Sequence, residues 1–597
     1  MNTAPKRKRK SSSRGWEHNP KLDPARGISM KLSIKISLFA ALAAVLFCVT
    51  QISSCGAVPP ARETEEAEDN IIIQDNSISD GDSASNYAES RPRAKVRDEL
   101  VVAFSRGELE LDFRKSYLAS EAQLFTAIYE GLFSYHPLTM EPIPAAARSW
   151  ETSEDHKEWR FTIRENAKFQ NGDSIRAEDF RASWLSLLDP EMDAPYSSLF
   201  DIIEGAQDFR LGRISADKVG ISCRDEKTLI VRLNSPAAFF PSMLCHHSFS
   251  PVHPSMLKKE NWERPVSNGP FIIQEMDETR ILLVKNTEYW DASRVKLNKL
   301  TIKFSEDGDD ASAMWNSGEA RWLHGDVNFE ALTDRGGIEV NAMFATHYYY
   351  IRSARKPWDD FRLRRALSLV LPWNKIREGY SLPARTLIYP IPDYPQIEGL
   401  ETANIEEAEK LLTDAGFPNG AGLPKLVIRI TPSMEAARIA SLMAEAWYSI
   451  LKINVVIDEV PYRLYFQSLK QDDYDVGSTT WIGDFADPYT FLQMWRRDSN
   501  LNDARHNDND YEELMEKSMN EEGTKRWQTL ADAEALLLNR GNVLPVSYSP
   551  AVNIIDLAEI DGWYPNVLDI HPFKYMSFAA RKPLPGVVMK PLQSLKG

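Results

Sequence analysis

The chain has 597 residues, of which 43% are hydrophobic and 26% charged, and its formal net charge is −16. A chain of this length and composition is expected to fold into several lobes with sizeable cores. Its acidic balance repels phosphate backbones, so we expect no nucleic-acid partner. Only four cysteines occur, and no CxxC pair indicates zinc or redox chemistry. Whether Cys223 and Cys245 form a disulfide stays open, because spacing alone does not give the Cα approach.

The first predicted element is a secretory signal. Lys31 and Lys35 precede an apolar run over residues 36–49, which is shorter than the ~20 residues of a comfortable bilayer span. Small residues then lead to Cys55, as in a bacterial lipobox. We therefore interpret residues 1–54 as an N-terminal extension with a signal peptide, and Cys55 as a lipidated mature terminus. An uncleaved anchor helix and a cleaved signal without lipid are the alternatives, and Met30 competes with Met1 as the start.

Residues 55–97 are predicted to form a disordered acidic tether. They are rich in Glu, Asp, Ser and Ala and hold one aromatic residue, Tyr87. Such a segment cannot bury enough apolar area to offset the conformational entropy of ordering the chain. Ordered structure should therefore begin near Asp98.

The folded body mixes strands and helices in its first half. Apolar runs and alternation predict strands, and apolar residues at helical spacing predict helices. The expected strands are 100–104, 159–164, 228–233 and 281–284, and the expected helices are 121–132 and 177–188.

The clearest pattern lies further along the chain. A helix over 406–415 is followed by a strand at 426–430, a helix at 435–451 and a strand at 454–457. Strand, helix and strand within about 35 residues indicate a βαβ unit with parallel strands. The fold class is therefore predicted to be α/β.

Motifs of catalysis are missing from the sequence. There is no G-x-S-x-G, Walker loop or H-E-x-x-H. We interpret His246, His247 and His253 as surface or packing residues, because a metal site needs several converging donors. Asp484 and Asp487 lack an accompanying nucleophile or metal motif. We expect no enzyme activity, no metal and no cofactor.

One short segment stands out as a candidate ligand site. Residues 481–488 read Trp-Ile-Gly-Asp-Phe-Ala-Asp-Pro. Trp481 offers a broad apolar surface, and Gly483 permits close approach of a ligand backbone. Asp484 can accept a hydrogen bond from a cationic group. An ordinary loop with a capping aspartate explains the residues equally well.

Several blocks in a fixed order give the segment a context. The chain resembles the oligopeptide-binding proteins of bacterial ABC importers, within the extracytoplasmic solute-binding proteins of family 5, from about residue 98 to the C-terminus. The blocks are 128–133, 166–169 with 177–180, 266–271, 285–290, 356–360 with 365–368, 415–420, the Trp481 segment and 566–570.

The resemblance implies a class II periplasmic-binding-protein fold, in which two main lobes close about a hinge and an extra domain is added. Lobe I is expected to comprise 98–129, 250–292 and 544–597, domain II 130–249, and lobe III 293–543. The implied function is extracytoplasmic capture of short peptides by a monomeric lipoprotein. The implied partners are a membrane permease and its cytoplasmic ATPase subunits.

The resemblance also implies particular site residues. Asp484 is expected to pair with the peptide α-ammonium, and Trp481 and Tyr462 to line a side-chain pocket. Backbone groups at Asn268, Gly269 and Gly483 are expected to bond the peptide main chain, and Tyr196 and Ala119 to lie near the ligand.

Departures from the family pattern leave some points open. Leu111-Asp112-Phe113 stands where the family usually has Leu-Asp-Pro, and Ser478 where a basic residue is common. No anchor for the ligand carboxylate is therefore assigned. Alternatives are another cargo on the same fold (a dipeptide, a nickel chelate, haem or a signalling peptide) and a surface lipoprotein with an interaction role.

Overall fold

The computed structural model describes residues 99–107, 109–258, 262–391, 393–579 and the strand 588–590. The predicted signal peptide, the tether and Cys55 lie outside these residues. Within them, no helix combines the length and apolarity needed to cross a membrane.

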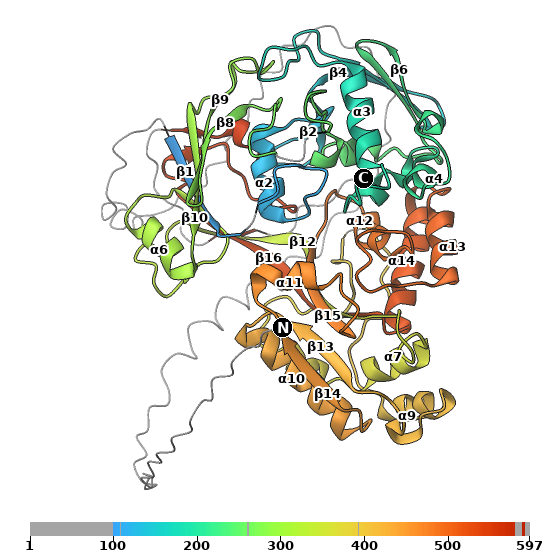
Figure 1. Cartoon of the computed structure of the whole chain (residues 1–597). Helices are drawn as coiled ribbons and strands as arrows, with labels where there is room; N and C mark the ends of the chain where they lie inside the picture. The colour runs from blue at the N-terminus through green and yellow to red at the C-terminus, as the bar shows by residue number, and fades with distance from the viewer. Residues whose placement is uncertain (1–98, 108, 259–261, 392, 580–587, 591–597) are drawn as a thin grey trace, which may run out of the picture. The chain divides into compact units, whose positions relative to one another are not determined.

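The main element is an eleven-stranded mixed sheet. Its long strands β12 (Ile338–Ile351) and β16 (Val543–Ile555) pair antiparallel along most of their length. They run between the two ends of the sheet, as Figure 1 shows. The other strands, in order across the sheet, are β14 (Val455–Glu459), β13 (Leu426–Ile430) and β15 (Val476–Ile482) on one side of this pair, and β11 (Trp322–His324), β1 (Glu99–Ser105), β10 (Lys299–Ser305), β9 (Arg280–Lys285) and β8 (Phe271–Met276) on the other, with β19 (Val588–Lys590) beside β12.

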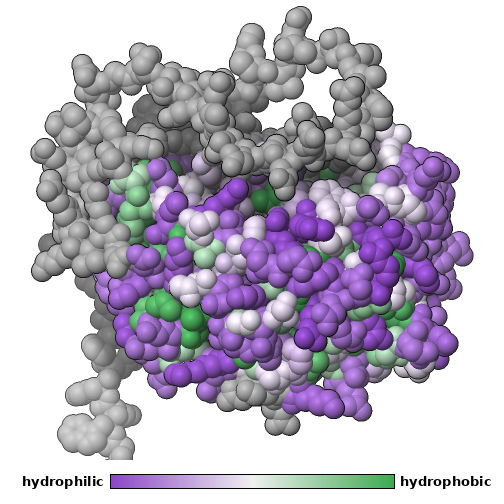
Figure 2. All heavy atoms as spheres, turned by 90° about the horizontal axis from the view of Figure 1, so that it is seen from above, coloured by the Kyte–Doolittle hydropathy of each residue, from purple (hydrophilic) through white to green (hydrophobic). Residues whose placement is uncertain are grey.

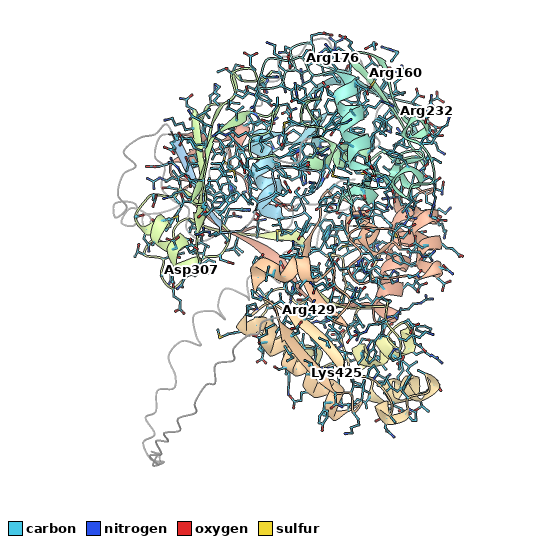
Figure 3. The ribbon with its side chains drawn as sticks, viewed as in Figure 1. Arg160, Arg176, Arg232, Asp307, Lys425 and Arg429 are labelled. Atoms are coloured by element: carbon cyan, nitrogen blue, oxygen red, sulfur yellow. The ribbon has the colours of Figure 1, made fainter. Side chains whose placement is uncertain are left out.

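A separate four-stranded sheet lies within residues 130–249. Its order is β4 (Ala147–Thr152), β5 (Glu158–Ile163), β7 (Thr228–Arg232) and β6 (Ile221–Asp225). Helix α3 (Ala177–Leu187) contacts β6 and β7, and its Phe180 and Trp184 are fully buried. Strand β5 alternates buried and half-buried residues as predicted. Arg160 and Arg232 point away from this core (Figure 3).

The predicted βαβ unit is confirmed. Strands β13 and β14 pair in parallel, with α10 (Met434–Ser449) between them in sequence. Ser433 caps α10 by accepting from the backbone N–H of Ala436, and α9 (Ile405–Asp414) precedes the unit. Figure 3 shows Arg429 on β13, where its guanidinium pairs with Asp458 of β14 at 2.8 Å and with Asp473 at 2.9 Å.

A helix boundary differs from the sequence interpretation. Helix α2 covers Ala119–Ile128 rather than 121–132, because Tyr129 takes an extended conformation and ends it. Strands β10 and β11 both pair in parallel with β1. These strands follow the predicted start of lobe III at residue 293, yet they pair with β1 of lobe I within one continuous sheet. The domain division stays a prediction.

The remaining elements connect and cover the sheets. The helices are α4 (Ala206–Arg210), α5 (Phe240–Met243), α6 (Gly308–Asn316), α7 (Phe361–Leu369), α8 (Trp373–Ile376), α11 (Tyr462–Ser468), α12 (Tyr489–Leu492), α13 (Asn509–Ser518) and α14 (Gly523–Asn539). The short strands are β2 (Phe133–Tyr135), β3 (Pro142–Pro144), β17 (Ile560–Asp561) and β18 (Ser577–Phe578). The 3-10 segments are η2 (Ser197–Ile202), η3 (Ala216–Lys218), η4 (His247–Phe249), η5 (Pro418–Gly420), η6 (Gln493–Trp495) and η7 (Phe573–Tyr575).

Apolar burial holds these elements together. One core lies around β1 and β8–β10, where Phe104, Trp322 and Phe573 are fully buried. A larger core continues from the four-stranded sheet to α10 and α14. Hydrophilic side chains dominate the face seen in Figure 2, with small separate hydrophobic spots. Cys223 and Cys245 are both free thiols.

Candidate functional site

A cavity of about 150 Å³ opens where segments distant in sequence meet. Its wall combines the start of α2, strand β2, the turn before η4, the end of β15 and the stretch 568–574. Aromatic rings and small residues make up much of this wall. The cavity is therefore built by tertiary contact rather than by one local motif.

Asp484 lies in the cavity wall directly after β15. Its Oδ1 accepts from the Tyr196 hydroxyl at 3.2 Å, and its Oδ2 accepts from the Thr490 hydroxyl at 3.1 Å. The Tyr135 hydroxyl donates to its carbonyl oxygen at 3.1 Å. Its own N–H donates to Thr490 Oγ1 at 2.9 Å. These bonds fix the position of the carboxylate. Each carboxylate oxygen accepts from one hydroxyl group, and neither hydroxyl carries a positive charge.

The electrostatic surroundings of Asp484 are unusual for a buried acid. Burial raises the pKa of Asp484 to about 7, and the Thr490 and Tyr196 hydrogen bonds oppose this rise. Among the described residues, the only nitrogen of a basic side chain within 4.0 Å is Nε2 of His246, at 3.7 Å from Oδ1. Burial lowers the pKa of His246 to about 3, so this ring is neutral at pH 7. The carboxylate therefore lacks a counter-charge within the described chain.

A second pair of charges in the wall is compensated internally. Lys574 Nζ donates to Glu130 Oε1 at 2.8 Å, and Trp290 Nε1 donates to Glu130 Oε2 at 2.5 Å. Tyr289 donates to the same carboxylate. Lys574 is 7% exposed and Glu130 6% exposed. This buried cluster ties residue 574 to the end of α2 and has no net charge to offer a ligand.

Five of the eight predicted binding residues line the cavity. They are Asp484, Trp481, Gly483, Tyr196 and Ala119. The Trp481 indole N–H donates to the Thr490 carbonyl at 3.1 Å, which holds the ring in place. A Cβ at Gly483 would lie 2.6 Å from the Phe344 ring. Packing against Phe344 is therefore enough to require glycine there, without any ligand.

The other three predicted residues lie elsewhere. Tyr462 on α11 is 66% exposed, and its ring meets Phe466 at a centroid distance of 5.7 Å. The Asn268 side chain accepts from the Glu130 N–H and donates to the Glu130 carbonyl. Gly269 donates to the Ile128 carbonyl, and a Cβ there would lie 2.4 Å from the Ile128 carbonyl carbon. These contacts give Asn268 and Gly269 a packing role, and their contact with a ligand stays a prediction.

Sequence reasoning missed several residues of the wall. Tyr135, Glu130 and Lys574 were not singled out, nor was Thr490, which bonds Asp484 without lining the cavity. The partners of Tyr135 and Lys574 are hundreds of positions away. Thr490 lies six residues after Asp484, the one local signal available. His246 is buried and His247 half-buried, and both line the cavity. No cluster of three or more metal-ligating side chains occurs among the described residues.

Known proteins share this architecture. The oligopeptide-binding protein of Bacillus subtilis is 29% identical over 68% of this chain and 80% of its own length. The structure of the murein tripeptide-binding protein of Escherichia coli is 25% identical, covers 81% of this chain and 99% of its own, and superimposes with a TM-score of 0.73. An unliganded open form of that protein, covering 81% of this chain and 98% of its own at 25% identity, gives 0.58.

A family model supports the same assignment. The model of the bacterial extracellular solute-binding proteins, family 5, matches residues 141–503, more than half of the chain. This stretch includes Tyr196, Trp481 and Asp484 and both strands of the βαβ unit. The chain belongs to the bacterial extracellular solute-binding proteins of family 5.

Proposed function

We propose that this chain captures short peptides outside the cytoplasmic membrane and delivers them to an ABC importer. The observation that carries this proposal is the Asp484 carboxylate, buried in a cavity with neutral neighbours. A peptide brings the missing positive charge as its terminal ammonium. Because every free peptide has this group, one carboxylate serves many cargoes.

The energetics favour a charged ligand end. A hydrogen bond to a charged group contributes roughly 1.5–3 kcal/mol. Burying an isolated carboxylate costs free energy, and burial therefore favours the protonated form of the carboxyl in the empty site. An incoming ammonium replaces this proton and donates to the same oxygens. The site therefore selects ligands that carry a cation over neutral molecules of similar size.

Similarity to named proteins supports the cargo. The B. subtilis relative is an oligopeptide-binding protein, and the E. coli neighbour binds a murein tripeptide. The chain superimposes better on that structure than on the unliganded open form of the same protein. The signal and Cys55 support export and lipid anchoring on the outer side of the membrane.

Calorimetry with tetra-alanine tests the ammonium anchor. We expect Asp484→Asn to weaken binding tenfold or more, and N-acetylation of the peptide to weaken binding to the wild type by a similar factor. Asp561→Asn, a substitution in strand β17, which does not line the cavity, is the control. Equal affinity for free and acetylated peptide would refute the anchor.

The cargo class and the anchor need separate measurements. Mass spectrometry of co-purified ligand should show peptides of a few residues; a metal chelate or haem would support another cargo on the same fold. For the anchor, Cys55→Ser should release the protein from membranes. A variant that still sediments with membranes would contradict lipidation at this cysteine.

A further inference from the structure

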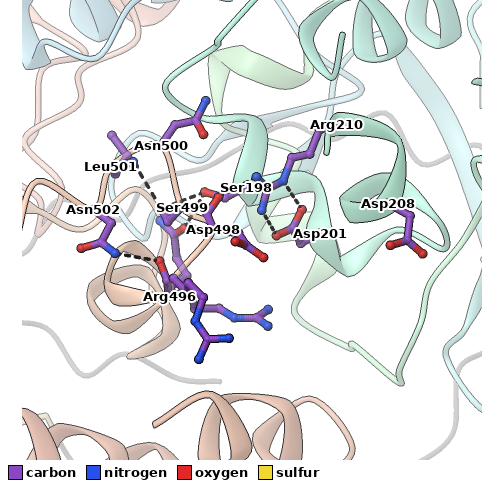
Figure 4. Close-up of polar contacts among 12 residues, drawn as sticks. Ser198, Asp201, Asp208, Arg210, Arg496, Asp498, Ser499, Asn500, Leu501 and Asn502 are labelled. Atoms are coloured by element: carbon purple, nitrogen blue, oxygen red, sulfur yellow. Dashed lines mark hydrogen bonds and ion pairs between the residues drawn. The ribbon is translucent and has the colours of Figure 1, made fainter. Parts of the chain in front are cut away.

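A row of polar contacts beside the cavity joins residues 193–235 to residues 493–520. The Ser198 hydroxyl lies 3.1 Å from the Ser499 hydroxyl and 3.3 Å from Gln493 Oε1. Ser235 donates to Asn520 Oδ1 at 3.2 Å. Figure 4 shows the central part of this row, which we call the polar seam. Its residues are Asp193, Ala194, Ser198, Asp201, Arg210 and Ser235 on one side, and Gln493, Asp498, Ser499, Asn500 and Asn520 on the other.

The charges of the seam are satisfied on one side of it. Arg210 makes two bonds to Asp201, at 2.7 and 2.6 Å, and both side chains are buried. Across the seam, Arg210 Nη1 donates to the Asp498 carbonyl at 2.6 Å. Of the three Arg210 bonds, separation of the two sides would break only the one to Asp498, because Asp201 and Arg210 lie on the same side. The seam can therefore open without leaving a buried charge unpaired.

The other hydrogen bonds of the seam are also of a kind that water can replace. The apolar core continues beside the seam, where Phe239 stacks on Phe485 at a centroid distance of 6.5 Å. Asn500 Nδ2 donates to Asp193 Oδ1 at 3.1 Å and to the Ala194 carbonyl at 2.9 Å, near the surface. Gln493 Nε2 is buried without a hydrogen-bond partner in the described residues. Interfaces between domains that move resemble transient protein interfaces and are more polar than permanent ones. Hydroxyls, amides and carbonyls dominate the contacts of this seam.

The seam is continuous with the ligand site. Tyr196, which donates to Asp484, directly precedes η2, and η2 carries Ser198 and Asp201. On the other side, Thr490 of α12 donates to Asp484, and Gln493 opens η6 just after α12. The same short elements therefore hold the Asp484 carboxylate and the seam. Tyr196 is two residues from Ser198, and Thr490 is three residues from Gln493.

We propose that the polar seam is a latch that forms as the two sides close over the cavity, and that it sets the lifetime of the bound complex. This inference rests on the proposed function for its ligand, a peptide held at Asp484. Contacts made only after closure slow ligand release more than they affect ligand entry. Ser198 and Asn500 thus act as positioning residues that do not touch the ligand.

Dissociation kinetics test the latch. In the Ser198→Ala/Asn500→Ala variant, tetra-alanine should leave about tenfold faster in stopped-flow fluorescence, since the hydrogen bonds of both side chains across the seam are lost. The association rate should stay within about twofold. Ser215→Ala/Asn171→Ala is the matched control, because both residues are exposed and bond only to nearby aspartates and His253. Equal dissociation rates in the two double variants would overturn the latch.

A reversible cross-link tests opening without relying on peptide binding. Ser198→Cys/Ser499→Cys, in a Cys223→Ser background, should form a disulfide because the hydroxyls lie 3.1 Å apart. Oxidised protein should retain trapped tetra-alanine until reduced. In the absence of ligand, small-angle scattering should show the oxidised form to be more compact than the reduced form. If wild type binds no tetra-alanine, the proposed function fails, and scattering still decides the latch: identical profiles would overturn it.

Discussion

Two buried aspartates, Asp201 within η2 and Asp484 bonded to the residue that precedes η2, have opposite surroundings. Asp201 meets Arg210 through two hydrogen bonds, and the pair lies in the polar seam. Among the residues that the structure describes, the Asp484 carboxylate meets only the hydroxyls of Tyr196 and Thr490 and the neutral ring of His246. Burial raises the pKa of both carboxyls, to about 7 for Asp484, whereas Arg210 opposes the rise at Asp201.

The difference distinguishes a structural charge from a binding charge. A buried aspartate that pairs with an arginine has its charge compensated, and removing either partner leaves the other charge buried and unpaired. A buried aspartate without a cationic neighbour has an uncompensated charge until a ligand supplies the cation. The cavity around Asp484 gives that ligand room. Position in the fold, rather than residue type, decides which role an aspartate has.

The strongest test of the comparison is Asp201→Ala. This substitution leaves the Arg210 guanidinium buried with no carboxylate, so the free energy of unfolding should fall by about 3–5 kcal/mol. Urea denaturation measures the loss. Asp208→Ala is the control, since Asp208 pairs with Arg213 at the surface of the same region, and exposed pairs contribute at most about 1 kcal/mol. Similar losses in both variants would contradict the structural role of the Asp201 pair.

In the ligand-free protein, Asp484→Asn should raise the free energy of unfolding, whereas Asp201→Ala should lower it. The folded pKa of Asp484 is about 7 against an ordinary 3.8, so folded protein binds this proton more tightly, and stability falls as pH rises from about 4 to 7. Asparagine does not titrate. The variant should therefore exceed wild type by about 2–4 kcal/mol at pH 8 and match it below pH 4. Urea denaturation at both pH values measures this difference. A variant less stable than wild type at pH 8 would show that the ionised Asp484 carboxylate does not destabilise the folded protein.

The smallest expected effect is the pH dependence of peptide affinity. Below pH 7 the empty site holds a proton that the ligand ammonium must displace, so Kd should rise by up to about tenfold per pH unit. Near pH 8 the peptide amine begins to lose its own proton. Affinity should thus peak between about pH 7 and 8. Calorimetry in buffers of different ionisation enthalpy should show proton release at pH 6, and an affinity independent of pH from 5 to 7 would contradict an anchor at Asp484.

Local patterns in the sequence predicted much of the fold. The βαβ unit at 426–459 followed from apolar runs separated by a helical period, and its strands pair in parallel as expected. The start of lobe III at residue 293 stays a prediction, and β10 and β11 after it pair with β1 about 200 residues away. Periodicity identifies a strand but does not choose its neighbour.

The candidate site was predicted in part. Resemblance of the Trp481 segment identified Asp484 and Trp481, both of which line the cavity. Tyr462 satisfied the same pattern yet lies exposed on α11. The Lys574–Glu130 pair joins positions separated by 444 residues, a proximity that composition and spacing along the chain do not encode.

The amino-acid sequence predicted a secretory signal, the α/β class, the family resemblance and an aspartate in an unusual loop, because these depend on neighbours within a few tens of residues. Only the tertiary structure decided that Asp484 is buried without a cation while Asp201 has one. Burial and charge pairing arise where distant segments exclude water together, and the pKa and role of a carboxylate follow from that exclusion.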